Sequence, residues 1–330
     1  MEKTLTITIP SYNVEKTLKE TVDSLLEPSI LNDLEILIVN DGSKDSTSEI
    51  AHEYEKNYPN TVRAIDKENG GHGSTINTGI REATGWYFKV VDGDDWLITE
   101  NLPRFLADLK KTNADIVYNP FFEVNDQTKE RKEIGQATTN LLFEHVYAFD
   151  EVSNQFSIQM HAMTYKTSIL KKHHIEIDEH RFYVDAEYVL MPIPFVQTIE
   201  LLEYPMYLYR MFTEQQSMNV KNMQKNVQHH YDVAMHMVDY YLRYAPLLTK
   251  EKREYMKKRV LALIEMQYQI YFSFPFDWNV TKEIERFNQA LKGKDVQIYK
   301  DSHGTMVRFI RLQPKLFYPV IKLREKVRRS

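Results

Sequence analysis

Four strand-like segments alternate with helical patterns over the first 91 residues, and this alternation constrains the fold more than any other feature. The strand-like segments cover residues 4–9, 34–39, 62–65 and 86–91. Apolar spacing predicts helices over 14–26 and 75–83, and Ser46 with Glu49 three residues later has the pattern of a capping box that opens another helix. Strands and helices that alternate in this way form parallel sheets with right-handed crossovers. The sequence therefore predicts an α/β fold with a mostly parallel, Rossmann-like sheet flanked by helices.

Polar residues follow each predicted strand. They are Ser11-Tyr12-Asn13, Asp41, the run 69–73 and the run 92–95. In an open α/β sheet, ligands bind beyond the carboxyl ends of the strands, so we expect these residues to meet in one crevice. Asp92, Asp94 and Asp95 would repel one another there without a counter-charge, which a divalent cation with oxygen ligands commonly supplies. Taken alone, the same Asp-Gly-Asp-Asp run also fits a solvated turn.

The alternation becomes irregular in the second hundred residues. Three segments are predicted there: 125–136 as a charged, mobile connection, 159–165 as a strand, and 166–173 as a helix. From about residue 223 onward the apolar spacing is helical. We therefore expect a first domain over residues 1–220 and a helical C-terminal region over 221–330.

The composition excludes several classes of protein. Without cysteine, the chain has no disulfide framework and no cysteine-ligated metal. Residues 306–330 hold eight Lys or Arg against one Glu, whereas the whole chain has a net charge of −5. An acidic body with a basic tail does not match a nucleic-acid binder, whose positive charge lies on the working face. The start of the chain leads directly into a strand and no stretch approaches the ~20 apolar residues of a bilayer span, so we expect a soluble or peripheral protein without a signal peptide.

In their order along the chain, these motifs resemble the successive signatures of family-2 inverting glycosyltransferases, which have a GT-A fold. The motifs are Ser11-Tyr12-Asn13, the run 39–47, Asn69-Gly70-Gly71 with Asn77-Thr78-Gly79, and Asp92-Gly93-Asp94-Asp95. The resemblance is dense over about residues 1–105 and thinner to about Ser217. It implies a nucleotide half over about 1–105 and an acceptor half over about 106–220.

The resemblance implies a nucleotide site at the first strand ends. Asp41 would accept a hydrogen bond from the base of a nucleotide-sugar, most often uracil. Pro10 and Tyr12 would wall the base, and Asn69 would lie nearby.

The same resemblance implies a metal site in the aspartate run. Asp94 would be the principal ligand of Mn²⁺ or Mg²⁺ through the donor diphosphate. Asp92, with Gly93 beside it, would reach the ribose or the metal, and Asp95 would brace the loop. A divalent ion suits this reaction because it neutralises charge that grows on the departing nucleoside diphosphate.

An inverting transfer also needs a carboxylate that takes the proton of the acceptor hydroxyl. The matching segment is 182–188, where the family usually has Glu-Asp; here Val184 replaces the first acid and Asp185 aligns with the base. Glu187 is the alternative, and the two side chains would point in different directions if a helix begins there. Asp185 also fits a plain acidic residue at a helix N-terminus, which the helix dipole favours.

One departure from the family pattern concerns the segment before Asn77. Many relatives have an arginine at the position of Ile76. A phosphate or base contact is therefore missing, or His72 replaces it.

Further downstream, Tyr209-Arg210 and Ser217 resemble a family segment that closes over the diphosphate. Arg210 is thus the candidate for a contact with the leaving group. His161 stands where relatives often have an aromatic residue, which favours a role in packing or in the acceptor wall over metal binding.

These features predict a cytoplasmic, metal-dependent, inverting glycosyltransferase. It would move a sugar from a nucleoside-diphosphate donor, UDP-linked by the resemblance, to a hydroxyl of a cell-surface polysaccharide, wall polymer or lipid-linked glycan. The basic segment 306–330 fits either contact with the inner face of an anionic membrane or a helix packed on the body. The helical C-terminal region fits pairing of subunits, a cover for the acceptor groove, or both. The alternatives are a nucleotidyltransferase of related fold, a non-catalytic nucleotide- or sugar-binding module, and a metal-binding scaffold.

Overall fold

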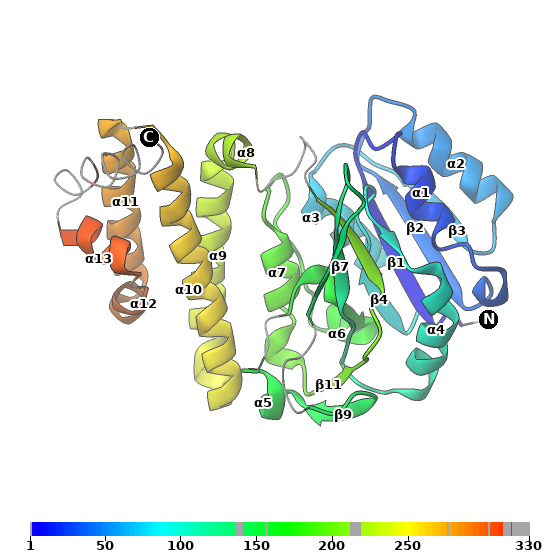
Figure 1. The fold of residues 1–330 in the computed structure, drawn as a ribbon. Helices are drawn as coiled ribbons and strands as arrows, with labels where there is room; N and C mark the ends of the chain where they lie inside the picture. The colour runs from blue at the N-terminus through cyan, green and yellow to red at the C-terminus, as the bar shows by residue number, and fades with distance from the viewer. Residues whose placement is uncertain are drawn as a thin grey trace. The chain divides into compact units, whose positions relative to one another are not determined.

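The computed structural model of the chain divides into two compact units, Met1–Thr213 and Glu214–Ser330. The residues that it describes are 2–135, 141–155, 158–211, 219–275, 277–302, 304–312 and 318. The first unit holds the sheets, and the second is helical (Figure 1).

The core of the first unit is an eight-stranded sheet with the order β3-β2-β1-β4-β10-β6-β11-β9. Its strands are β1 (Leu5–Ser11), β2 (Leu34–Asn40), β3 (Val62–Asp66), β4 (Tyr87–Val90), β6 (Ile116–Tyr118), β9 (His145–Ala148), β10 (Met163–Lys166) and β11 (Thr198–Leu201). The four strands from β3 to β4 are parallel, and β6 and β11 are parallel to each other. Two strands run antiparallel to their neighbours, β10 to β4 and β6, and β9 to β11. The predicted α/β fold with a mostly parallel sheet is confirmed.

The first two strands are completely buried because helices cover the sheet. Every residue of β1 and β2 is buried, as expected for strands that read as near-continuous apolar runs. The sequence placed the end of the first strand before Pro10, but β1 continues to Ser11. Proline is tolerated there because β4 pairs only with Leu5–Thr8, so the missing N–H of Pro10 breaks no ladder bond on that side.

Helices join the parallel strands. They are α1 (Leu18–Asp23), α2 (Thr47–Asn57), α3 (His72–Glu82), α4 (Leu102–Lys111), α5 (Phe149–Val152), α6 (Thr167–Lys172) and α7 (Asp185–Leu190), with short 3₁₀ turns η1 (Pro28–Ile30), η2 (Thr99–Asn101), η3 (Met160–Ala162) and η4 (Ile193–Phe195). Helix α3 packs on β1 and β2, and α2 packs on β2 and β3.

The predicted capping box at the start of α2 is wrong, although the helix begins where expected. Asp45 accepts the hydrogen bond from the Thr47 amide, at 3.1 Å, and Glu15 accepts that of Ser46, at 3.0 Å. Because these carboxylates satisfy the first amides of the helix, the Ser46 side chain makes no cap bond.

A second, four-stranded sheet has the order β5-β12-β7-β8. Its strands are β5 (Trp96–Leu97), β7 (Phe121–Asn125), β8 (Arg131–Ile134) and β12 (Tyr207–Met211). The segment predicted as a mobile connection, 125–136, therefore contains an edge strand that pairs antiparallel with β7. The prediction failed because β8 lies at the edge of its sheet, where charged residues replace the apolar alternation of a half-buried strand.

The second unit contains α8 (Val220–Lys225), α9 (Val227–Tyr244), α10 (Lys250–Ser273), α11 (Trp278–Lys294), α12 (Val296–Asp301) and α13 (Thr305–Leu312), with the turn η5 (Ala245–Leu247). The predicted helical C-terminal region is confirmed. Arg311, in the described part of the basic tail, donates to Tyr268 Oη at 3.0 Å and to Ser302 Oγ at 2.7 Å. That part of the tail therefore packs on the unit. None of the helices in the described ranges has the length and apolar character that crossing a membrane requires.

Candidate active site

The loops that follow β1, β2 and β4 meet at one edge of the large sheet, as the sequence predicted. The amide of Asp41, directly after β2, donates to the Ser11 carbonyl at the end of β1, at 2.8 Å. On the other side, the amide of Gly93 donates to the Pro10 carbonyl at 3.2 Å. These bonds continue the sheet ladder past the strand ends and fix the spacing between the predicted base-binding and metal-binding loops.

Asp41 is buried and holds the glycine-rich loop that precedes α3. Its carboxylate accepts hydrogen bonds from the amides of Gly70 and Gly71, at 2.9 and 2.8 Å, and from Lys67 Nζ at 2.9 Å. The Asn69 side chain donates to the Asp41 carbonyl at 2.9 Å. Gly71 has a φ of +83°, a conformation in which a residue with a Cβ would be strained. Asp41 thus shapes this loop, and its contact with a nucleotide base remains a prediction.

The two residues predicted to flank the nucleotide base, Pro10 and Tyr12, differ in exposure. Pro10 is buried, whereas the Tyr12 side chain is 51% exposed at the edge of the crevice. Next to it, Asn13 has a φ of 54° and is held by side-chain bonds with Ser43 and Lys44 of the loop after β2. Tyr12 is therefore a ring in solvent on a fixed backbone, which suits stacking on a planar ligand.

His72, the first residue of α3, faces the aspartate loop. Its Nε2 lies 2.8 Å from Asp92 Oδ1. Burial alone would lower the pKa of His72, but the charge and hydrogen bond of Asp92, with the charges of Asp185 and Asp94, outweigh it and raise that pKa. Burial opposes ionisation of Asp92, yet His72 holds the pKa of Asp92 below its ordinary value. His72 therefore contacts the aspartate loop, and its replacement of a phosphate or base contact remains a prediction.

Asp94 and Asp95 have different surroundings. Burial raises the pKa of Asp94 to about 6, and the charge of Asp92 adds to this effect. The Asp95 carboxylate accepts from Tyr207 Oη at 2.6 Å and from the Arg210 amide at 2.7 Å. Burial, with the charges of Asp94 and Asp92, raises the pKa of Asp95 well above its usual range. Asp95 therefore ties the loop to β12, whereas Asp94 carries a charge that its surroundings do not balance.

Arg210 lies under the same loop. Its Nε donates to the Asp94 carbonyl at 2.7 Å, and its two terminal nitrogens donate to the carboxylates of Glu20 and Asp126. The guanidinium also stacks on Trp96, 4.6 Å from the ring centre. The side chain is only 8% exposed, so Arg210 braces the aspartate loop from beneath; its predicted contact with the leaving group remains a prediction.

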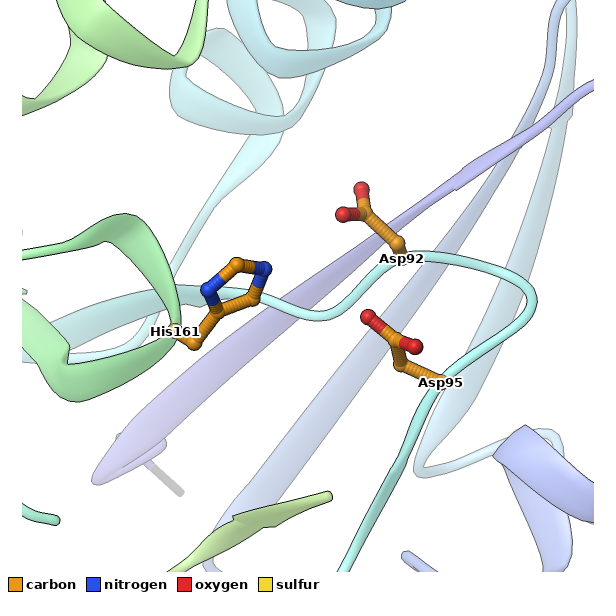
Figure 2. A group of neighbouring side chains, drawn as sticks. All are labelled: Asp92, Asp95 and His161. Atoms are coloured by element: carbon orange, nitrogen blue, oxygen red, sulfur yellow. The ribbon is translucent and has the colours of Figure 1, made fainter. Parts of the chain in front are cut away.

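His161, in η3, points its side chain toward Asp92 and Asp95 (Figure 2). Ligand atoms of Asp92, Asp95 and His161 lie within 4.8 Å of one another. The imidazole stacks on Tyr209, with ring centres 4.2 Å apart, as the expected packing role requires. Its Nδ1 is buried and has no hydrogen-bond partner within the described residues. The sequence offered no sign of this proximity, because η3 lies some 70 residues from the aspartates and the two meet only through β10 beside β4.

These donors fit a divalent cation. Carboxylate oxygens suit Mn²⁺ or Mg²⁺, and one ring nitrogen of His161 lies within 4.8 Å of carboxylate oxygens of Asp92 and Asp95, close enough for a shared ion. Within that group Asp95 already accepts two short hydrogen bonds and Asp92 is 2.8 Å from His72, while Asp94, the predicted principal ligand, lies next to them in the same loop.

Lys89, in β4, is buried directly behind this cluster. Its Nζ donates to the carbonyls of His161 and Met163, at 2.9 and 3.2 Å. Burial lowers the pKa of Lys89 to about 7. A lysine in an apolar strand gave no signal of this role, which is to hold the backbone of η3 in place.

The two candidate bases differ sharply in exposure. Asp185 is the first residue of α7 and is exposed, whereas Glu187 is completely buried. Glu187 accepts a hydrogen bond from the Asp178 amide at 2.7 Å. Asp185 is close enough to the aspartate cluster to raise the pKa of His72. The structure therefore presents Asp185, rather than Glu187, as the carboxylate that a substrate could reach.

Asn77 and Ser217 are the remaining residues that the sequence predicts for the site. Asn77, in α3, uses its side chain on the backbone of Ile177, with both hydrogen bonds at 2.8 Å. Ser217 lies outside the described residues.

Residues 6–174 match the family model described as "Glycosyl transferase family 2". The glycosyltransferase EpsJ of Bacillus subtilis strain 168 is 31% identical over 215 residues, which are 62% of this chain and 60% of that protein. The teichoic acid poly(glycerol phosphate) polymerase of Staphylococcus epidermidis is 28% identical over 208 residues, 62% of this chain and 28% of that protein. The chain thus spans 60% or less of the length of these relatives.

Among solved structures, residues 1–349 of Staphylococcus aureus TarS in complex with UDP have the same fold. The TM-score is 0.70 at 16% sequence identity, and the match covers 98% of this chain and 91% of that chain. The same TarS segment in complex with UDP-GlcNAc matches with a TM-score of 0.67 at the same identity, covering 98% and 91%. The GT-A architecture predicted from the sequence is therefore confirmed.

Proposed function

The chain belongs to glycosyl transferase family 2, and from that premise we propose that it transfers a sugar from a UDP-linked donor to a hydroxyl of a cell-surface polymer, with inversion at the anomeric carbon. The transfer uses a divalent cation, Mn²⁺ or Mg²⁺. One observation carries the proposal: the partly buried cluster of Asp92, Asp95 and His161 lies at the carboxyl edge of the sheet, and a separate, exposed carboxylate, Asp185, lies close enough to raise the pKa of His72 beside it.

The nucleotide site lies at the ends of β1 and β2 in this proposal. Tyr12 stacks on the base, and Pro10 closes the pocket beneath it. Asp41 and Asn69 hold the loop whose amides line the site. Gly93 lets the backbone of the aspartate loop approach β1, since a Cβ there would lie 3.0 Å from the Pro10 carbonyl oxygen.

Asp94, Asp92 and His161 are the residues that would hold the cation. When bound, the ion supplies positive charge to the donor diphosphate as the glycosidic bond breaks. His72 restrains Asp92 from the side of α3, and Arg210 with Tyr207 holds the loop from beneath. These contacts preorganise the carboxylates that would hold the cation, and the cation would in turn stabilise the negative leaving group.

Asp185 acts as the general base. Its carboxylate takes the proton of the acceptor hydroxyl while that oxygen forms a bond to the anomeric carbon. The bond from the anomeric carbon to the phosphate oxygen breaks on the opposite face, and its electron pair leaves with UDP. An exposed carboxylate suits this role because the acceptor must reach it from solvent.

The choice of substrates rests on relatives. TarS has been crystallised with UDP and with UDP-GlcNAc, which supports UDP-sugars as the first donors to test. The relatives include a teichoic acid polymerase and the minor teichoic acid biosynthesis protein GgaB of Bacillus subtilis strain 168, which supports a wall polymer as the acceptor. Contact of segment 306–330 with a membrane stays a prediction.

Calorimetry tests the nucleotide site. UDP should bind in the presence of Mn²⁺. Asp94→Ala should weaken that binding by about 10- to 100-fold, because one proposed ligand of the cation is lost. A screen of UDP-sugars with purified wall teichoic acid then identifies donor and acceptor by UDP release. Metal binding that does not depend on UDP would indicate a metal-binding scaffold, and UDP binding without turnover of any donor would indicate a non-catalytic module.

A further inference from the structure

The segment that leads to Asp185 has an unusual backbone. His174, His180 and Tyr183 have φ values of 48°, 56° and 68°, in the left-handed region that residues with a Cβ rarely adopt. Strained backbone of this kind persists only where surrounding contacts enforce it. Contacts from α3, from the glycine-rich loop before it and from α7 hold residues 177–180 of this segment.

Asn77 provides the first contact. Its Nδ2 donates to the Ile177 carbonyl and its Oδ1 accepts from the Ile177 amide, each at 2.8 Å. The side-chain amide thus pairs with both backbone groups of one residue, as a neighbouring strand would. Both functional atoms of Asn77 are used in this way, so the residue faces the base-bearing segment instead of a nucleotide.

The glycine-rich loop provides the second contact. The His180 amide donates to the Gly70 carbonyl at 2.5 Å. A Cβ atom at Gly73 would lie 2.1 Å from the Asp178 carbonyl oxygen, a distance that no side chain tolerates. The loop that Asp41 holds through Gly70 and Gly71 is therefore in direct backbone contact with the segment before Asp185.

Glu187 provides the third contact. The buried Glu187 carboxylate accepts from the Asp178 amide at 2.7 Å, which ties this segment to α7, the helix that Asp185 begins. Asp178 is thus held by Glu187 on one side and lies against Gly73 on the other.

We propose that Asn77 is a positioning residue: together with Glu187, it holds residues 177–180 so that the Asp185 carboxylate is aligned with the acceptor hydroxyl. The inference rests on the proposed function, since it assigns Asp185 as the base. It gives a specific role to Asn77, which the sequence offered only as part of a motif, and it links the loop on Asp41 to the base through backbone contacts.

The test compares Asn77→Ala and Asn77→Asp with Arg81→Ala as a matched control on the exposed side of the same helix. Calorimetry measures UDP affinity with Mn²⁺, UDP release measures kcat and the donor KM with wall teichoic acid, and hydrogen exchange measures protection of the Ile177 and Asp178 amides. Asn77→Ala should lower kcat by about 10- to 100-fold, since a misplaced catalytic group costs this much, while UDP affinity and donor KM stay within about two-fold. The Ile177 amide should lose its protection.

Asn77→Asp keeps the acceptor for the Ile177 amide but turns a carboxylate oxygen toward the Ile177 carbonyl and Glu179, to which Asn77 Nδ2 donates at 2.8 and 3.4 Å, so its kcat should also fall below that of the wild type. Arg81→Ala should match the wild type in every measurement. An unchanged kcat in Asn77→Ala would overturn the inference, and so would a loss of UDP affinity in proportion to kcat, which would return Asn77 to the nucleotide site. If Asn77→Ala does not fold, Asn77→Asp decides by the same criteria. Failure of the proposed function is distinguishable, because it would appear in the wild type as absence of UDP binding or of sugar transfer.

Discussion

The aspartate loop after β4 and the start of α7 both carry carboxylates, but the protein treats them in opposite ways. Asp95 is buried, accepts hydrogen bonds from Tyr207 and the Arg210 amide, and has a strongly raised pKa. Asp185 is exposed on a strained segment whose neighbours are held by backbone contacts. The comparison shows that neighbouring donors hold the aspartate loop through Asp95, whereas solvent reaches the carboxylate at the start of α7.

The largest effect should come from the exposed carboxylate. Asp185→Asn should lower kcat by about 10²- to 10⁴-fold, because general-base catalysis contributes that much. UDP affinity with Mn²⁺ should not change, since Asp185 does not touch the nucleotide in the proposed site. Steady-state kinetics and calorimetry together check this expectation.

The variant Glu187→Gln tests the alternative that Glu187, and not Asp185, is the base. Glutamine keeps an oxygen that can accept from the Asp178 amide, so this variant should retain a substantial part of the wild-type kcat. A Glu187→Gln enzyme as inactive as Asp185→Asn would make Glu187 the base and reverse the comparison.

The buried scaffold beneath the aspartate loop should show the next largest effect, on stability. Arg210→Ala removes a buried guanidinium that joins the Asp94 carbonyl, Glu20 and Asp126. We expect the free energy of unfolding to fall by about 2–4 kcal/mol, as for loss of one partner in a charged, hydrogen-bonded network. Urea unfolding measures the change, and the surface variant Arg81→Ala is the control. A shift below about 0.5 kcal/mol, the range of ordinary surface substitutions, would mean that Arg210 is not structural.

Tyr207→Phe should have a smaller effect of the same kind. It removes the hydroxyl that donates to Asp95 and accepts from the Asp92 amide, so the buried Asp95 carboxylate keeps only the Arg210 amide, at a cost of about 1–3 kcal/mol. The same urea titration measures it. A variant as stable as the wild type would show that the Arg210 amide alone suffices to hold Asp95.

Replacing Lys89 should have the smallest effect on the unfolding free energy near neutral pH, and this effect should change with pH. Because burial lowers the folded-state pKa of Lys89 to about 7, the unfolded chain binds more protons than the folded chain between about pH 7 and the usual lysine pKa of ~10.4. The unfolding free energy should therefore rise with pH in this window by up to ~1.4 kcal/mol per unit from this residue alone. Lys89→Met should lose that contribution to the slope; parallel curves for the two proteins from pH 7 to 9 would contradict the expectation.

The sequence was most informative where function is carried by loops that directly follow strands. The strands before Asp41 and Asp92 were visible as apolar runs, and the parallel order that brings their ends together follows from the alternation with helices. Asp185 was identified through its motif and not through any physical pattern, since one aspartate before a short helix has many explanations.

The contacts that the sequence did not reveal are those between distant segments. Tyr207 and His161 approach the aspartate loop from distant strands or turns, and Lys89 holds the His161 carbonyl, because of a strand order that local spacing does not encode. The contact of Asn77 with Ile177 was not foreseen for the same reason, since the two residues are 100 positions apart. The hairpin of β7 and β8 was missed because exposed strands and charged loops have similar composition.

The reversed strand β10 has a mechanical consequence. It pairs with β4 on one side and with β6 on the other, so it joins the part of the sheet that carries the aspartates to the part that leads toward α7. Both parts belong to one continuous hydrogen-bonded sheet, so they cannot move apart without breaking its hydrogen bonds. In the proposed reaction, we therefore expect substrates to enter and products to leave through movement of loops at the edge of the sheet, without separation of its two parts.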